Sequence, residues 1–326
     1  MKRRQFVTLI GSAAVAWPIV ARAEQPAKVT RIGFLGAVSA EDLRIHLDAL
    51  REGLRDLGHV EGKNLIIEYR WAEGKYDRLP KLAAELVRLD VSIIVTHGTP
   101  GSLAAKRATA TVPIVMAISG DAVATGLIQS IARPGGNVTG STFFFPELNA
   151  KRVDLLKEAI PPIRLIGVLV NPNNASHVPA LRAMEATARS LQLEIHPFPA
   201  KEPGQFAGAF SAMVERRVEA VAVVDDRMLI AGGRTIAKLA MTRRLPIIGG
   251  RELIEGDGLM AYGVDFVPMY RRAATFVDKI LKGAKPADLP VEQAAKFELV
   301  VNLRAARALG INMPLSILLR ADQVIE

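Results

Sequence analysis

Six polar segments that follow apolar runs are the chain's best candidates for binding chemistry. Their glycines leave backbone N–H groups accessible, and their hydroxyls and carboxylates can hydrogen-bond to a carboxylate or an amine. Because Ser, Asn and Asp are also the preferred residues of helix caps and turns, each one taken singly is equally well explained as a cap. The candidate ligand-binding residues are Ser39, Gly98, Thr99, Ser102, Ser119, Asp121, Asn171, Asn173, Asp225, Asp226 and Tyr262.

The positions of these residues suggest what each would hold. Thr99 and Ser102 lie where a helix is expected to begin after a strand, and a helix N-terminus favours an anion such as a carboxylate. Asp121 follows the next strand and is the candidate partner of an ammonium group, with Asp225 or Asp226 approaching from the opposite lobe. Together these segments offer groups that could hold a carboxylate and an amine.

Aromatic and imidazole side chains give a weaker signal. The chain has four Tyr and two Trp, one of them Trp17, so a stacking cage for an aromatic ligand is not evident. Tyr262 and the triplet Phe143-Phe144-Phe145 could form apolar walls, although hinge packing explains the triplet slightly better. His97 lies at the end of an expected strand and could line a site, but a lone histidine is more often structural.

Alternating strands and helices must position these segments. Continuous apolar runs between amphipathic segments are typical of parallel strands covered on both faces. Two such series predict an α/β fold with two doubly wound parallel-sheet lobes and a cleft between them, at the carboxyl ends of the strands. The expected strands are 31–36, 64–70, 91–98 and 112–119 in the first series, and 164–171, 193–199, 218–226 and 245–250 in the second.

The last part of the chain is expected to pass between the lobes. A strand over 258–265 leads to a helix over about 267–281, and a further strand over 296–302 follows a hinge-like segment. We therefore expect crossings near residues 143, 265 and 291. The predicted division is a signal peptide over 1–23, one lobe from 24–143 plus 265–290, and a second lobe from 144–264 plus 291–326.

Several function classes lack their signatures. The sequence has no G-x-S-x-G, no complete phosphate loop and no G-x-G-x-x-G after a strand, which argues against a hydrolase or nucleotide enzyme. The five histidines lack metal-ligand spacing and there is no cysteine, so no metal, cofactor or disulfide is expected. The net charge of +9 is spread along the chain without a basic block, which disfavours nucleic acid as a partner.

The first 23 residues have the three parts of a secretory signal: Lys2-Arg3-Arg4, an apolar run to Val20 and the A-x-A site Ala21-Arg22-Ala23. The apolar run is short for a membrane span, so we expect export and cleavage before Glu24. The arginine pair before Gln5-Phe6 resembles a twin-arginine signal; general secretion is the alternative route, and a buried N-terminal helix the alternative structure. No cysteine is available for lipidation, so the mature protein is expected to be free in the periplasm.

Longer motifs resemble a known family. "GHVEGKNLIIEYRWAEGKYDRLPKLAAELV", "HGTPGSLAAKRAT", "VPIVMAISGDAVATGLIQSIARPGGNVTG", "LVNPNN" and "KPADLPVEQAAKFELVVNLRAARALGI" look like the ABC-transporter substrate-binding proteins of the tryptophan/tyrosine type. The match spans the mature chain in order. It implies the type I periplasmic-binding fold, with two lobes, three crossovers and a ligand cleft.

The resemblance also implies a function. It indicates a monomeric periplasmic receptor that is not an enzyme. This receptor would close its lobes on an amino acid, aromatic or other, or on a similar small organic solute, and deliver it to the membrane permease of an ABC importer. A ligand-sensing regulator of the same fold is one alternative, but the signal occupies the place of its DNA-binding segment. A secreted α/β enzyme is the other, disfavoured by the missing catalytic motifs.

Overall fold

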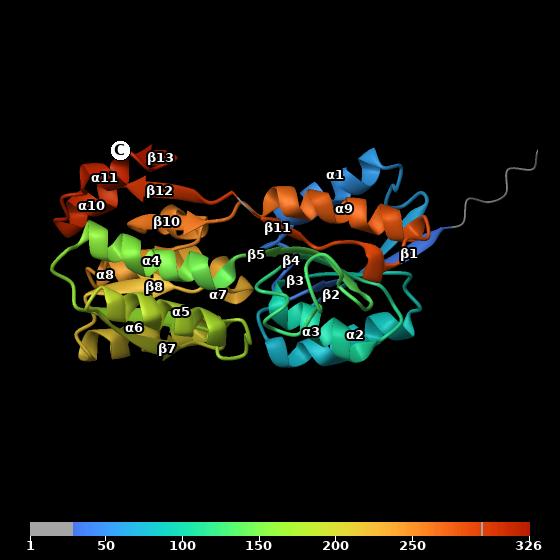
Figure 1. Ribbon diagram of the computed structural model, residues 1–326, viewed down its shortest axis with the longest axis horizontal. Helices are drawn as coiled ribbons and strands as arrows, with labels where there is room; N and C mark the ends of the chain where they lie inside the picture. Colours follow the sequence, from blue (N-terminus) through green and yellow to red (C-terminus); the bar gives the residue numbers. More distant parts are fainter. Residues whose placement is uncertain (1–28, 295) are drawn as a thin grey trace, which may run out of the picture.

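The computed structural model describes residues 29–294 and 296–326, which form two α/β lobes side by side (Figure 1). The signal-peptide prediction lies outside the described residues. Lobe 1 is built on a six-stranded sheet in the order β11-β5-β4-β3-β1-β2, in which every neighbouring pair is parallel. Its strands are β1 (Thr30–Gly36), β2 (Leu65–Trp71), β3 (Ile94–His97), β4 (Ile114–Ser119), β5 (Val138–Phe143) and β11 (Glu292–Ala294).

Two pairs of helices cover the two faces of this sheet, α1 with α9 and α2 with α3 (Figure 1). The helices are α1 (Arg44–Asp56), α2 (Leu79–Arg88), α3 (Gly98–Ala108) and α9 (Val267–Leu281), and the 3-10 turn η1 (Tyr76–Arg78) precedes α2. Strands β3 and β4 are buried along their whole length, as expected for central strands covered on both faces.

Lobe 2 has a seven-stranded sheet in the order β13-β12-β10-β9-β8-β6-β7. Its strands are β6 (Leu165–Val170), β7 (Glu194–Pro199), β8 (Ala220–Val223), β9 (Ile247–Gly249), β10 (Met260–Gly263), β12 (Glu298–Asn302) and β13 (Gln323–Ile325). The five strands from β7 to β10 pair in parallel, whereas β12 runs antiparallel to β10 because it returns from the other lobe.

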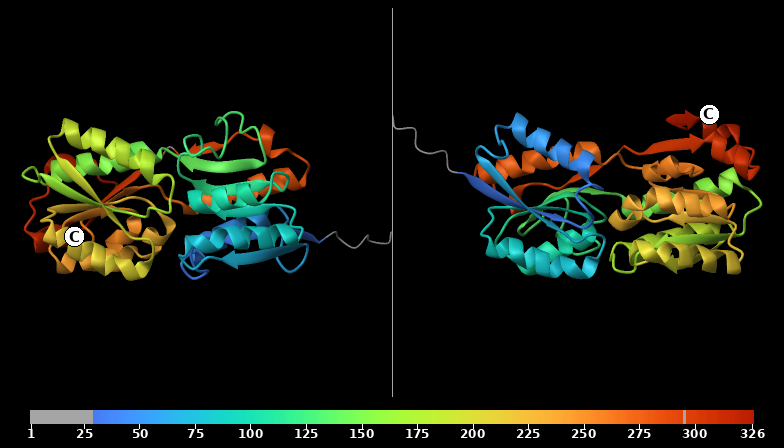
Figure 2. Two further views of the ribbon diagram at one scale, coloured as in Figure 1. Left: turned by 90° about the horizontal axis from the view of Figure 1, so that it is seen from below. Right: turned by 180° about the vertical axis from the view of Figure 1, so that it is seen from behind.

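Helices flank the lobe 2 sheet on both sides, which is clear from below (Figure 2, left). Helix α4 packs against α5, and α6 packs against α8. The helices are α4 (Phe145–Ala159), α5 (His177–Ser190), α6 (Phe206–Glu215), α7 (Arg227–Ala231), α8 (Gly233–Thr242), α10 (Leu303–Leu309) and α11 (Leu315–Leu318), and the remaining 3-10 turns are η2 (Pro203–Gln205), η3 (Arg251–Gly256) and η4 (Pro286–Asp288). Both lobes are thus three-layered, and the α/β fold with two doubly wound lobes is confirmed.

The chain crosses between the lobes three times: from β5 to α4, from β10 to α9, and from β11 to β12 (Figure 1). Strand β11 pairs with β5 in lobe 1, and β12 pairs with β10 in lobe 2, so the crossing segments run close together. The predicted boundary at 291 therefore differs from the structure, where residues 292–294 still belong to the lobe 1 sheet.

The sequence did not predict β5, β11, β13 or helix α4, so lobe 1 has six strands where four were expected, and lobe 2 has seven where six were expected. Strand β5 was missed because its buried positions are polar: Thr139 donates to the Leu289 carbonyl and Thr142 to the Gly120 carbonyl. Gly140 has φ +126°, and a Cβ there would lie 2.1 Å from the Met116 carbonyl oxygen. A Gly/Thr/Ser segment can thus form a central strand whose composition resembles a loop.

Neither a membrane span nor a metal cluster is found among residues 29–294 and 296–326. None of their helices combines the length and apolar character needed to cross a bilayer. No group of three His, Asp or Glu side chains is arranged to hold a metal ion in that part of the chain.

Candidate functional site

A cavity lies between the lobes, at the carboxyl ends of the central strands of both sheets. Its walls come from the ends of β3 and β4 in lobe 1 and from the loop after β8 in lobe 2. The cavity is small and narrow, with a volume of about 30 Å³. Five predicted site residues line it: Gly98, Thr99, Ser119, Asp225 and Asp226.

Direct contacts hold the two lobes together around the cavity. The Tyr76 hydroxyl of lobe 1 donates to Asp226 Oδ1 at 3.0 Å and accepts a hydrogen bond from the Met228 N–H at 3.1 Å. The Thr99 and Ser176 hydroxyls are 2.5 Å apart across the cleft. The structure is therefore a closed form in which the lobes already meet.

Asp226 is fully engaged in structural contacts at its Oδ1 atom. This oxygen accepts hydrogen bonds from the Tyr76 hydroxyl, the Asn171 amide and the Met228 N–H, and so caps α7. Oδ2 accepts one hydrogen bond, from the Asn174 amide at 2.9 Å, which leaves acceptor capacity on that atom. Asp226 is 3 % exposed, and every group that donates a hydrogen bond to its carboxylate is neutral.

Asp225 is paired with a buried arginine that the sequence did not suggest. Arg152, on helix α4, is 0 % exposed and donates to Asp225 Oδ1 at 3.0 Å. It also donates to the carbonyls of Val223 and Tyr262, which ties the ends of β8 and β10 together. Asp225 Oδ2 is 2.9 Å from the same guanidinium but accepts no hydrogen bond of suitable geometry, so this buried oxygen keeps a free lone pair.

Arg227 is the cation of the cavity. It is 6 % exposed and forms no hydrogen bond or ion pair with the described residues. Its guanidinium stacks on Phe266, 4.4 Å from the ring centroid, and its stem crosses the cleft to lobe 1, where Cγ lies 3.4 Å from the Cβ position of Gly98. Because a buried charge without a partner is costly, this arginine indicates an anionic ligand group.

Helix α3 presents its N-terminus to the same point. Gly98 has φ +72°, so the chain turns sharply from β3 into the helix there. The N-cap residue His97 makes no side-chain capping hydrogen bond, so the first N–H groups of α3 lack an acceptor. Arg227 of lobe 2 and the positive end of α3 in lobe 1 therefore face each other.

The cavity's apolar wall is aromatic. Phe143, Phe145 and Phe266 all line it; the Phe143 ring meets the other two edge to face, with centroids 5.3 and 5.7 Å away. Phe144, in contrast, is 43 % exposed. Phe143 and Phe145 thus form apolar walls of the cavity at the first crossover. Sequence analysis offered this role for the triplet but slightly favoured hinge packing.

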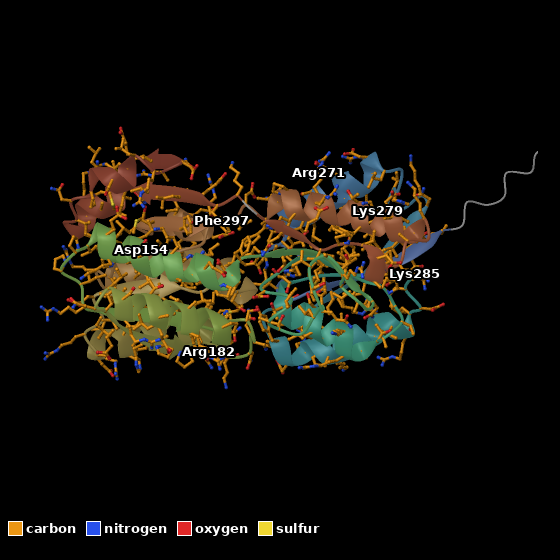
Figure 3. All side chains as sticks on the ribbon, in the orientation of Figure 1. Asp154, Arg182, Arg271, Lys279, Lys285 and Phe297 are labelled. Atoms are coloured by element: carbon orange, nitrogen blue, oxygen red, sulfur yellow. The ribbon has the colours of Figure 1, made fainter. Side chains whose placement is uncertain are left out.

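Other predicted residues lie outside the cavity lining. Ser39 bonds to the Asp42 carboxylate at the approach to α1, and the Ser102 hydroxyl donates to the Gly98 carbonyl inside α3. Tyr262 stacks on Phe297 beside the third crossover, where Figure 3 labels the phenylalanine.

The loop carboxylate Asp121 also stays apart. Its Oδ1 accepts the N–H groups of Val123 and Ala124 at 3.1 and 2.9 Å, so it stabilises a turn. Asn171 supports Asp226, as described, and the exposed Asn173 donates its N–H to the Asn171 side chain. The ammonium role predicted for Asp121 is therefore better served by Asp225.

The main residues that sequence analysis missed are Tyr76, Arg152 and Arg227. Arg227 directly follows the predicted Asp225-Asp226 pair, so its position in the motif was the available signal. Tyr76 and Arg152 lie in segments that gave no polar strand-end pattern, and only the fold brings Tyr76 to the cavity and Arg152 to Asp225 behind it.

Comparison with known proteins identifies the family. Residues 31–325 match the family model described as ABC transporter substrate binding protein. The "Tyrosine-binding protein" of Clostridioides difficile (strain R20291) is 25% identical over 270 residues, which are 81% of this chain and 77% of that protein.

Two solved structures are similar over most of the chain. One is a conserved domain protein from Vibrio cholerae, with a TM-score of 0.84 and 28% identity, covering 91% of this chain and 100% of that one. The other is an ABC domain in complex with L-Trp from Streptococcus pneumonia, with a TM-score of 0.81 and 27% identity, covering 90% and 100%.

The chain belongs to the ABC transporter substrate-binding protein family. It is the extracytoplasmic solute-binding component of such a transporter and not an enzyme, which confirms the resemblance seen in the sequence.

Proposed function

We propose that this protein captures an amino acid with an aromatic or other apolar side chain and delivers it to the permease of an ABC importer. The observation that carries the proposal is Arg227, a buried cation without a partner among the described residues, placed between the lobes. A solute carboxylate there would pair with Arg227 from lobe 2 and with the N-terminus of α3 from lobe 1. The anion would thus join the lobes.

The solute's ammonium group is assigned to lobe 2. Asp225 Oδ2 has a free lone pair and Asp226 Oδ2 accepts a single hydrogen bond, and both residues line the cavity. Asp225 pairs with Arg152, whereas Asp226 and Arg227 form no ion pair with each other; the formal charges of these four side chains nevertheless sum to zero. An electrically neutral zwitterion preserves that balance, whereas a simple anion or cation would leave a buried excess.

The apolar wall supports an aromatic or aliphatic side chain. The cavity is lined by the apolar side chains of Phe143, Phe145, Phe266 and Ile118. Two of the three proteins compared above are described with an aromatic amino acid: the Clostridioides difficile protein with tyrosine and the Streptococcus pneumonia structure with L-Trp. The cavity volume of about 30 Å³ is far below the roughly 300–1,000 Å³ found for small-molecule sites, so the lobes must separate for a solute to enter.

Delivery would depend on lobe closure. Solute contacts from both lobes favour the closed form, because a ligand shifts a two-state equilibrium by its differential affinity for the two states. The permease would then recognise the closed shape of a monomeric receptor.

Calorimetric titration of the purified mature protein with L-tyrosine, L-tryptophan, L-leucine and L-glutamate tests the proposal. We expect binding of at least one of the first three, no binding of L-glutamate, and a smaller radius of gyration of a monomer in small-angle scattering on saturation. Absence of binding to all apolar amino acids, or binding of L-glutamate alone, would contradict it.

We also propose export to the periplasm by the twin-arginine route, with cleavage between Ala23 and Glu24, on the strength of the N-terminal motif. The mature protein should then begin at Glu24, and replacing Arg3 and Arg4 together by Lys should stop export. Unchanged export of that variant would indicate general secretion instead.

A further inference from the structure

Six buried side-chain atoms of the described residues have no hydrogen-bond partner, and two of them belong to residues that line the cavity. One is the acceptor Asp225 Oδ2 in lobe 2, already assigned to the ammonium group. The other is Nδ1 of His97 in lobe 1. Asp225 Oδ2 lies 2.9 Å from the Arg152 guanidinium, whereas His97 Nδ1 has no partner among the described residues. A buried polar atom without a partner is unfavourable, so His97 Nδ1 indicates a group that the solute supplies.

The hydrogen bonding of His97 fixes which ring nitrogen carries the proton. The Ala37 N–H donates to His97 Nε2 at 3.0 Å, so Nε2 must present its lone pair. A neutral imidazole then has its hydrogen on Nδ1, the atom without a partner. The ring is held in place by stacking on Phe34, with centroids 5.9 Å apart and planes 20° apart.

The surroundings of His97 keep the ring neutral. The side chain is 0 % exposed, and burial, with a smaller contribution from the nearby charge of Arg227, lowers the pKa of His97 well below its usual value. His46, on α1, is neutral for the same two reasons, which lower its pKa to about 3. His97 is therefore a hydrogen-bond donor at Nδ1 throughout the neutral pH range.

A second buried histidine shows what a fully bonded ring looks like in this fold. His177 of lobe 2 accepts the Asn171 N–H at Nδ1, at 3.0 Å, and its Nε2 lies 3.3 Å from the Asp225 carbonyl oxygen. Both of its nitrogens thus have partners within the protein. His97 has the equivalent N–H acceptor bond but no partner for its own donor.

We propose that His97 is a specificity-determining residue whose Nδ1–H donates a hydrogen bond to the solute carboxylate, beside Arg227 and the N-terminus of α3. This inference rests on the proposed function, because it assumes a solute with a carboxylate in this cavity. His97 lines the cavity, directly precedes the first residue of α3, and faces the point where Arg227 crosses from lobe 2. A donor fixed in lobe 1 and an acceptor fixed in lobe 2 set the direction of the bound zwitterion.

Two substitutions separate the two nitrogens of His97. In His97→Gln, the amide oxygen can replace Nε2 as the acceptor for the Ala37 N–H, but no donor remains at the place of Nδ1. In His97→Asn, the amide nitrogen can replace the Nδ1 donor, but the Ala37 N–H loses its acceptor. His97→Gln should lose affinity for the solute and keep its stability. His97→Asn should keep its affinity and lose stability.

The probes are L-tyrosine and L-tryptophan, titrated into both variants and wild type, with Tm measured in the absence of solute. We expect His97→Gln to bind roughly 10- to 100-fold more weakly, as for loss of a hydrogen bond to a charged group, with Tm near the wild-type value. We expect His97→Asn to bind within about threefold of wild type and to have a Tm lower by roughly 2–10 °C. Wild-type affinity in His97→Gln would overturn the proposal for His97 alone.

Nitrogen NMR of the histidine rings gives an independent check. The spectrum of wild type should show His97 protonated at Nδ1 and unprotonated at Nε2, and a proton on Nε2 would overturn the proposal. Wild-type protein that binds neither these probes nor L-leucine would contradict the proposed function, and with it this inference, whereas wild-type affinity in His97→Gln overturns this inference alone.

Discussion

On the lobe 2 face of the cleft the two carboxylates are held by partners within the protein, whereas on the lobe 1 face neutral donors have none among the described residues. Asp225 is paired with the buried Arg152, and Asp226 is held by amides and hydroxyls. Lobe 1 offers His97 Nδ1 and the first N–H groups of α3. Arg227 alone extends from the charged face to the neutral one.

This difference indicates a division of labour. The buried charges of lobe 2 need fixed partners in the open form as well, because a carboxylate without them would be costly to bury. The neutral donors of lobe 1 can remain unpaired until a ligand binds at a smaller cost in free energy, since they carry no charge to desolvate. Figure 3 labels four surface cations that do not line the cavity: Arg182, Lys279 and Lys285 on the outside of the lobes, and Arg271, which pairs with Glu52 and Asp56 of α1.

Replacing the crossing cation should break the arrangement most severely. In Arg227→Met the apolar stem remains against Phe266, but the carboxylate loses its only cation in the cavity. Calorimetry should show affinity for L-tyrosine or L-tryptophan reduced by at least about 100-fold, since a buried charged hydrogen bond is worth roughly 2–5 kcal/mol. Arg234→Met is the matched control, because Arg234 pairs with Glu255 on the surface and does not line the cavity; an equal loss there would refute the assignment.

Breaking the ion pair within lobe 2 should affect folding. Asp225→Asn leaves Arg152 buried without its anion, so urea denaturation should show the free energy of unfolding reduced by about 3 kcal/mol. The exposed pair of Arg234 and Glu255 provides the comparison, and Glu255→Gln should change the free energy of unfolding by less than about 1 kcal/mol. Similar losses in the two variants would show that the buried pair contributes no more to stability than the exposed pair.

Removing a single contact between the faces should have a smaller effect. Tyr76→Phe loses the hydroxyl that links η1 of lobe 1 to Asp226 and to the start of α7. The closed form should lose about 1.5 kcal/mol, equivalent to roughly tenfold in solute affinity. Small-angle scattering without solute should then give a larger radius of gyration, and an unchanged profile and affinity would exclude a role in closure.

The smallest effect concerns stability in acid, away from the cleft. Burial alone would raise the pKa of Asp278, but hydrogen bonds from Lys282 and His59 outweigh it and hold the pKa below its usual value. A carboxylate with a lowered pKa stabilises the fold above its unfolded pKa of about 4, and that contribution is lost as the pH falls through the lower folded value. Asp278→Asn should therefore be less stable near neutral pH and show a shallower loss of Tm between about pH 5 and 2. An acid profile parallel to wild type would contradict this.

The sequence predicts the lobes well because parallel strands buried on both faces leave a strong apolar pattern. The same pattern places Gly98, Thr99, Ser119, Asp225 and Asp226 at strand ends, where they line the cavity. Strand β5 lacks this pattern because its buried interior is Thr139-Gly140-Ser141-Thr142, in which the two threonine hydroxyls donate to carbonyls of other segments. Helix α4 was not predicted because the polar residues Asn149 and Arg152 interrupt the apolar pattern of its buried face.

The roles of the site residues depend on partners far along the chain, which no local pattern contains. Asp225 and Asp226 are adjacent in sequence, yet one is bonded by an arginine 73 residues away and the other by a tyrosine 150 residues away. His97 could be recognised as a ligand group only after its second nitrogen was seen to bond Ala37, 60 residues away. Sequence therefore located the cleft, and the fold was needed to tell bonded groups from free ones.

The central claim is that the cleft closes on a carboxylate held between Arg227 and lobe 1. The most direct test is calorimetric titration of the wild type and Arg227→Met with L-tyrosine and with tyramine, which is the same molecule without the carboxylate. The wild type should bind tyramine at least about 100-fold more weakly than L-tyrosine, and this difference should largely disappear in Arg227→Met. Wild-type protein that binds both compounds within about threefold of each other would contradict the claim.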